Sequence, residues 1–74
     1  MLKNNYFNLR INGKQYKIFC FYHLTIYHLL IFFDFKVNLI AVEYNGKIIS
    51  PNFYKTKFVI SNSNIEIVTI VGGG

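Results

Sequence analysis

The sequence predicts a single α+β domain, in which one main helix packs across a mixed sheet of four or five strands. Two Asn-Gly dipeptides each separate a pair of short, mostly apolar segments, which is the pattern of β-hairpins. Between the two pairs lies one segment whose apolar residues recur with the period of a helix. The chain has 74 residues, of which 53% are hydrophobic, and this is ample for one small core.

The first hairpin is predicted from YFNLRI, residues 6–11, and QYKIFC, residues 15–20. Apolar and polar residues alternate along both segments, as they do in strands with one buried face. Asn12-Gly13 lies between them, and these residue types accept the positive φ angles that a two-residue hairpin turn requires. The buried face is expected to carry Phe7, Leu9 and Ile11 from the first strand and Tyr16, Ile18 and Cys20 from the second.

A helix is expected to begin after Thr25, whose hydroxyl can cap the helix by accepting a hydrogen bond from an amide of the first turn. Ile31 and Phe32 lie outside the apolar stripe of this helix and are unusually hydrophobic for an outer face. Either they contact another protein, or the small sheet curls round to cover them. The stripe itself, at positions i, i+3, i+4 and i+7, consists of Ile26, Leu29, Leu30 and Phe33.

Strand patterns return in the second half of the chain. Residues 39–44, LIAVEY, lead into the second turn, Asn45-Gly46, and a short strand at 47–49 follows. Ser50-Pro51-Asn52 is a turn sequence, and Phe53-Tyr54 is expected to pack beneath it.

The last predicted strand covers residues 65–71, after a brief pairing at 56–60 and a polar turn at 61–64. Both of its faces are mainly apolar, which favours a position inside the sheet rather than at its edge. The predicted elements follow the order hairpin, helix, strand, short strand and final strand. This is the order of the β-grasp, or ubiquitin-like, roll. We expect residues 1–71 to form this domain and residues 72–74 to form a flexible C-terminal tail.

The three glycines of that tail, Gly72 to Gly74, have no side chains to pack and much conformational entropy to lose. One interpretation is a frayed terminus. Because an apolar strand precedes them, another is a slim extension held at a fixed exit point, reaching about 10 Å beyond the strand. Such an extension could enter a narrow enzyme channel and present the α-carboxylate of Gly74.

Other classes of function are less well supported. The apolar run at residues 18–33 is shorter than the ~20 residues that span a bilayer and contains His23 and His28, so no membrane association is predicted. The formal net charge is +5, but the basic residues are scattered, so no nucleic-acid partner is predicted either. Cys20 is the single cysteine, so no multi-cysteine metal site can form. We expect its side chain to be a buried structural thiol.

Three segments resemble the ThiS family, the sulfur carriers of thiamine biosynthesis. IEIVTIVGGG (residues 65–74) is similar to the C-terminal signature of that family, TIYHLL (25–30) to the start of its helix, and VEYNGKII (42–49) to its central strand and turn. Asn62-Ser63 departs from the family, where many members have Gly-Asp before the last strand. Asparagine tolerates left-handed geometry, so we expect the turn to survive.

The resemblance implies a carrier protein that acts as a co-substrate rather than an enzyme. In such a scheme a ThiF-type adenylating enzyme uses ATP to activate Gly74, and sulfur from a cysteine desulfurase converts it into a thiocarboxylate. A ThiG-type thiazole synthase then takes the sulfur for the thiazole ring of thiamine. The carrier itself would hold no cofactor, metal or catalytic residue. Its partner-binding tail would consist of Val71, Gly72, Gly73 and Gly74.

Two related functions stay open, the small subunit of molybdopterin synthase and a ubiquitin-like modifier of lysines. Isoleucine, asparagine, phenylalanine, lysine and tyrosine, whose codons are rich in A and T, make up more than half of the chain. Such a composition favours a plastid stroma as the compartment, with a bacterial cytoplasm as the alternative.

Overall fold

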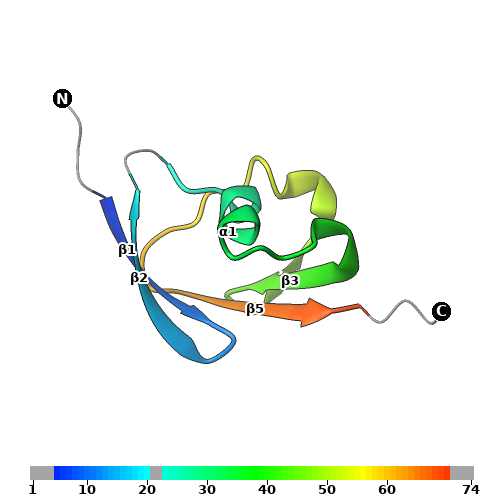
Figure 1. The fold of residues 1–74 in the computed structure, drawn as a ribbon, viewed down its shortest axis with the longest axis horizontal. Coiled ribbons are helices and arrows are strands. Elements are labelled where there is room, and N and C mark those ends of the chain that lie inside the picture. The colour runs from blue at the N-terminus through cyan, green and yellow to red at the C-terminus, as the bar shows by residue number, and fades with distance from the viewer. Residues whose placement is uncertain (1–4, 21–22, 71–74) are drawn as a thin grey trace.

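A computed structural model describes residues 5–20 and 23–70. In Figure 1 helix α1 lies across one face of a twisted sheet, which confirms the predicted α+β roll. The sheet has five strands in the order β2-β1-β5-β3-β4; β1 and β5 run parallel and the other neighbours run antiparallel. The elements are β1 (Asn5–Ile11), β2 (Lys14–Cys20), α1 (Ile26–Phe32), η1 (Val37–Leu39), β3 (Ile40–Tyr44), β4 (Lys47–Ile49), η2 (Pro51–Phe53) and β5 (Ser63–Thr69), where η denotes a 3-10 helix.

The β1–β2 hairpin forms as the alternation predicts. Asn12 and Gly13 have φ angles of 52° and 82°, the positive values that the two-residue turn needs. Leu9, Ile11 and Ile18 face the helix and are buried. Cys20 is free and only half-buried, because it lies at the end of β2, so the expectation of a buried thiol is met in part.

Helix α1 begins where the capping argument placed it. The Thr25 hydroxyl accepts a hydrogen bond from the His28 backbone N–H at 3.1 Å. The apolar stripe faces the sheet, and Phe33, at the C-cap, packs edge-on against Tyr16 with ring centroids 5.0 Å apart. The core between helix and sheet contains Leu9, Ile11, Ile18, Leu24, Ile26, Leu29, Leu30, Ile40, Val42, Tyr44, Tyr54, Val59, Ile65 and Ile67.

The second half of the chain differs from expectation in two places. Tyr54 packs beneath the turn and is 2% exposed, but Phe53 is 59% exposed, because neighbouring residues of a tight helical turn cannot both point into the core. Strand β5 begins at Ser63, two residues before the predicted start, so the turn is confined to Ser61 and Asn62. It ends at Thr69, two residues before the predicted end. Asn62 has a φ of 69°, and the turn survives as expected.

A buried polar cluster fixes this early start of β5. The Ser63 and Tyr44 hydroxyls lie 2.7 Å apart, and Ser63 also donates to the Ile60 carbonyl at 2.6 Å. The Tyr44 hydroxyl in turn accepts from the Ile60 N–H at 3.0 Å. Ser63 can therefore be the first residue of a buried strand although it is polar, because its hydroxyl is fully paired by hydrogen bonds.

The two buried tyrosines are expected to respond differently to loss of the hydroxyl. Tyr44→Phe should lower the free energy of unfolding by about 1–3 kcal/mol, because it removes a hydrogen-bond partner from Ser63 and from Ile60. The Tyr54 hydroxyl is buried with no hydrogen-bond partner among the described residues. Burial raises the pKa of this phenol above its ordinary value of 10.0, and the nearby Val42 backbone partly opposes the rise.

Tyr54→Phe removes only an unpaired polar atom, so it should keep full stability or gain up to about 1 kcal/mol. Urea unfolding of both variants, followed by circular dichroism, measures the difference. Equal losses in the two variants would contradict this assignment of the buried hydrogen bonds.

Candidate functional site

Strand β5 leads directly to the predicted carrier tail, and it is the central strand of the sheet, as its two apolar faces predicted. It pairs with β3 along its length, from Tyr44↔Ile65 to Ile40↔Thr69. Figure 1 shows β5 running on past the tip of the β1–β2 hairpin. The four predicted site residues, Val71 to Gly74, lie outside the described residues.

Asn12, in the first hairpin turn, holds β5 from one side. Its backbone N–H donates to the Ile65 carbonyl at 2.9 Å. Its side-chain oxygen accepts from the Ile67 N–H at 2.7 Å, and its side-chain nitrogen donates to the Ile67 carbonyl at 3.1 Å. The side-chain amide thus continues the pairing of β5 where β1 has turned away.

Asn45, in the second hairpin turn, holds the start of β5 from the other side. Its backbone N–H donates to the Asn64 carbonyl at 2.8 Å, and its side-chain oxygen accepts from the Asn64 N–H at 2.7 Å. The two Asn-Gly turns therefore fix β5 laterally at both sides. The direction of β5, the strand that precedes the predicted tail, is thereby set.

The outer sheet face, which we define as the sheet surface away from α1, is apolar beside the end of β5. Val68 is 57% exposed and Ile48 is 79% exposed, and Ile70 follows them toward the tail. Ile48 also lines a mainly apolar groove of about 450 Å³ with Phe53 and Lys57, so the apolar surface continues around the edge of β4. A shallow hollow of about 120 Å³ on this face is lined by Ala41, Val42, Glu43, Ile48, Glu66 and Val68.

Two of the three acidic residues of the chain meet on this same face. Glu43 and Glu66 lie directly opposite each other on β3 and β5. Like charges in this position disfavour the pairing of the strands. A basic side chain of a partner protein would relieve that repulsion.

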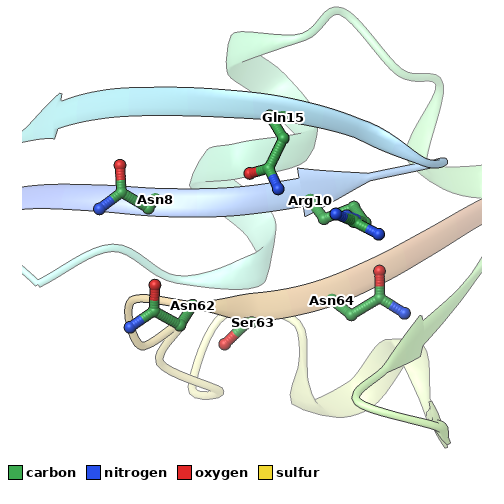
Figure 2. Close-up of a pocket in the computed structure, with 6 residues that line it drawn as sticks. All are labelled: Asn8, Arg10, Gln15, Asn62, Ser63 and Asn64. Carbon is green, nitrogen blue, oxygen red and sulfur yellow. The ribbon is translucent and has the colours of Figure 1, made fainter.

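A polar cavity of about 370 Å³ lies at the other end of β5, beside the strand start. Figure 2 shows its side chains arranged along β2, β1 and the beginning of β5. It offers amide groups and one guanidinium for hydrogen bonding, at the end of the strand that is remote from the tail. The lining residues are Asn8, Arg10, Gln15, Asn62, Ser63 and Asn64.

The sheet does not cover the hydrophobic outer residues of the helix. Ile31 is half exposed and Phe32 is 71% exposed, so the alternative in which the sheet curls round them is wrong. The sheet is on the opposite side of α1, against Ile26, Leu29 and Leu30. Contact with another protein stays a prediction for these two residues.

The two histidines are both exposed and have different neighbours. His23 stacks near Phe58, with ring centroids 5.1 Å apart, and the His28 ring nitrogen lies 3.0 Å from the Thr25 hydroxyl. Within residues 5–20 and 23–70, no group of three or more His, Cys, Asp or Glu side chains is placed to hold a metal ion. None of the helices described there is long and apolar enough to cross a membrane.

Comparison with models of protein families identifies the family of this chain. The model of the ThiS family matches residues 9–74, which include the predicted tail. The chain belongs to the ThiS family. Among solved structures, the thiamine biosynthesis protein ThiS from Geobacter metallireducens has the same fold, with a TM-score of 0.79 and 25% identity. The match covers 90% of this chain and 99% of the Geobacter chain.

Two relatives are similar over most of the length of this ThiS-family chain. The uncharacterized protein ycf40 of Trieres chinensis is 39% identical over 64 residues, which are 86% of this chain and 85% of the relative. The uncharacterized protein ycf40 of Porphyra purpurea is 31% identical over 71 residues, which are 96% of this chain and 97% of the relative. With its β-grasp fold, the chain is a ubiquitin-like sulfur carrier of the ThiS type.

The sequence alone did not identify the strand-holding roles of Asn12 and Asn45. Each was predicted as a turn residue, and each is one. The partners of their side chains lie far along the chain, 55 residues away for Asn12 and 19 for Asn45. The strongest available signal was the choice of asparagine rather than aspartate or glycine at the first position of both turns.

Proposed function

We propose that this ThiS-family chain carries sulfur as a thiocarboxylate on Gly74 and donates it for the thiazole ring of thiamine. The match of the ThiS family model through residue 74 is the observation that carries the proposal. The fold supports it, because β5, the strand that precedes the proposed tail, is central in the sheet and is held on both sides.

The proposed chemistry begins at the free carboxylate of Gly74. This group is a poor electrophile, because a nucleophile that attacks it must expel oxide. A ThiF-type partner would use ATP to activate it: a carboxylate oxygen of Gly74 attacks the α-phosphorus, and pyrophosphate leaves. A persulfide sulfur, derived from a cysteine desulfurase, then attacks the carbonyl carbon and displaces AMP, and a thiol cleaves the S–S bond of the resulting acyl disulfide and leaves as a disulfide with the sulfur carrier group. The product is the thiocarboxylate that a ThiG-type synthase consumes.

The chain takes part in these steps as a co-substrate rather than as an enzyme. ATP and all catalytic groups belong to the partners. The narrow tail, Val71 to Gly74, would enter their active sites, and glycine suits this role because a residue without a side chain fits a narrow channel.

The outer sheet face beside the tail is the surface on which we expect these partners to dock. Val68, Ile70 and Ile48 offer exposed apolar area next to the tail exit, and such area is typical of protein contact sites. Glu43 and Glu66 would favour a partner with a basic side chain at this position.

The small subunit of molybdopterin synthase is the second candidate, because it shares the fold and the chemistry of the tail. Thr69, Ile70 and Val71 precede the glycines here, whereas prolines are more frequent in that subunit. Co-purification with a thiazole synthase or with the large subunit of molybdopterin synthase distinguishes the two. A ubiquitin-like modifier would instead leave adducts on target proteins that survive reducing agent.

We place the protein in the plastid stroma. Its composition is rich in residues with A- and T-rich codons. The similar proteins from Trieres chinensis and Porphyra purpurea carry the name ycf40, a chloroplast-encoded gene of algae. Imaging of the tagged protein in its host tests this placement.

The function is tested by intact-mass analysis of the protein after incubation with ATP, a ThiF-type enzyme and a sulfur donor. The expected result is a mass increase equal to the difference between one sulfur and one oxygen atom, located on the C-terminal peptide. Omission of ATP should prevent it, because activation precedes sulfur transfer. The enzyme's own carrier serves as the positive control. If the enzyme loads that carrier with sulfur and leaves the mass of this chain unchanged, the proposal is refuted.

A further inference from the structure

The β1 side of β5 has no neighbouring strand at its last residue, Thr69. The alternation of backbone groups along the strand shows which N–H and C=O groups point to that side. Along a strand, the backbone groups of successive residues point to opposite neighbours. Asn64 and Ile70 bond toward β3, through Asn45 and through the Leu39 carbonyl at 2.7 Å. Ile65 and Ile67 bond to Asn12 on the β1 side. By the same alternation, the N–H and C=O of Thr69 point to the β1 side.

Asn12 replaces two groups that a longer β1 would supply. In a parallel ladder, the carbonyl of residue 12 would accept from the Ile67 N–H, and the N–H of residue 14 would donate to the Ile67 carbonyl. The side-chain oxygen and nitrogen of Asn12 occupy these two roles, at 2.7 Å and 3.1 Å. The next group in the series would be an acceptor for the Thr69 N–H.

That acceptor is absent among the described residues. The pairing of β1 with β5 ends at Ile11↔Ile65, and the chain turns back at Gly13 into β2. Thr69 is exposed, as are its neighbours Val68 and Ile70. The last residue of the central strand therefore presents an unpaired donor and acceptor, spaced for one more strand.

We propose that the β1-side edge of β5 at Thr69 binds an extended segment of the adenylating partner, which adds to the sheet by backbone hydrogen bonds. A carbonyl of that segment accepts from the Thr69 N–H, and an N–H of the segment donates to the Thr69 carbonyl. The inference rests on the proposed function, because it assigns how that partner grips the carrier.

The adenylating partner is the occupant that geometry favours. Gly74 is five residues beyond Thr69, so the two are at most about 18 Å apart in an extended chain. An enzyme that holds Gly74 in its active site therefore has a surface within reach of this edge. Pairing there would also fix the strand direction up to the start of the tail, which lowers the entropy cost of threading it.

The test replaces single backbone amides by esters in chemically synthesised protein, which removes one N–H and keeps the side chain. An ester at Thr69 removes the N–H that faces the open edge. The matched control is an ester at the buried residue Val59, whose N–H donates to the Leu24 carbonyl within the domain at 2.7 Å. Both are measured by urea unfolding and by the KM and kcat of ATP–pyrophosphate exchange with the ThiF-type enzyme.

The Thr69 ester is expected to keep the urea midpoint of the all-amide protein and to raise the KM by about three- to tenfold, the effect of one lost hydrogen bond. The Val59 ester is expected to lower the urea midpoint, because it removes a hydrogen bond inside the domain, and to leave the KM unchanged. An unchanged KM for the Thr69 ester would overturn the inference.

Two further outcomes would also overturn it. If the Thr69 ester changes the sedimentation of the protein alone and leaves the exchange kinetics intact, the edge binds a second copy of this chain. If the all-amide protein supports no exchange with an active enzyme, the proposed function fails and this inference fails with it. A failure of the inference alone therefore differs from a failure of the function.

Discussion

Deletion of Gly74 is expected to abolish sulfur loading while the free energy of unfolding changes by less than about 0.5 kcal/mol. The deletion moves the terminal carboxylate back by about 3.5 Å, so it no longer reaches the position at which the partner activates it. Stability is kept because glycine has no side chain to bury in the core. Intact-mass analysis reports the loading, and urea unfolding reports the stability.

Gly74→Ala is the matched control for this deletion, because it keeps the length of the chain and adds one methyl group. It is expected to load more slowly than the natural chain and faster than the deletion variant. Full loading of the deletion variant would show that Gly74 is not the modified residue. A large loss of stability would show instead that the tail is part of the folded domain.

Ile67→Asp is expected to unfold the domain. Ile67 lies in the middle of the central strand and is 5% exposed, packed beneath the helix. A carboxylate at this position would be buried without a charged partner, at a cost of several kcal/mol, which is comparable to the whole stability of a small domain. Far-UV circular dichroism and the dispersion of amide NMR signals measure the loss of structure.

Val68→Asp is the control for Ile67→Asp, because it places the same charge one residue further along β5 on the opposite face. The Val68 side chain is exposed on the outer sheet face, so this variant is expected to fold. It should nevertheless impair adenylation, since it adds a negative charge to the proposed docking surface beside Glu66. A folded Ile67→Asp protein would mean that the facing of β5 is wrong.

Local chemistry explains why much of the fold could be predicted. Asn12-Gly13 and Asn45-Gly46 adopt the positive φ angles that their hairpin turns require, so both hairpins follow from dipeptides. Thr25 caps the helix through a hydrogen bond to a residue three positions away. Strand alternation then decided which residues of β1 and β2 enter the core.

Some features depend on partners that are distant in the sequence, and these could not be predicted. Ser63 reads as a turn residue because serine prefers turns, yet it begins β5 because Tyr44 and Ile60 pair its hydroxyl inside the domain. Phe53 and Tyr54 have similar hydrophobic character, and only the geometry of η2 decides that Tyr54 is the buried one.

The features of the candidate site can likewise be separated into those that follow from the sequence and those that depend on the tertiary structure. The sequence determined the glycine tail, the apolar strand before it and the central position of that strand, because these depend on residue type and on the period of a strand. The tertiary structure alone decided that Asn12 completes the pairing of Ile67, that the open edge begins at Thr69, and that Val68 and Ile48 share one exposed face. These features arise only when residues more than 19 positions apart are brought together, and a sequence pattern encodes its near neighbours much more strongly than such contacts.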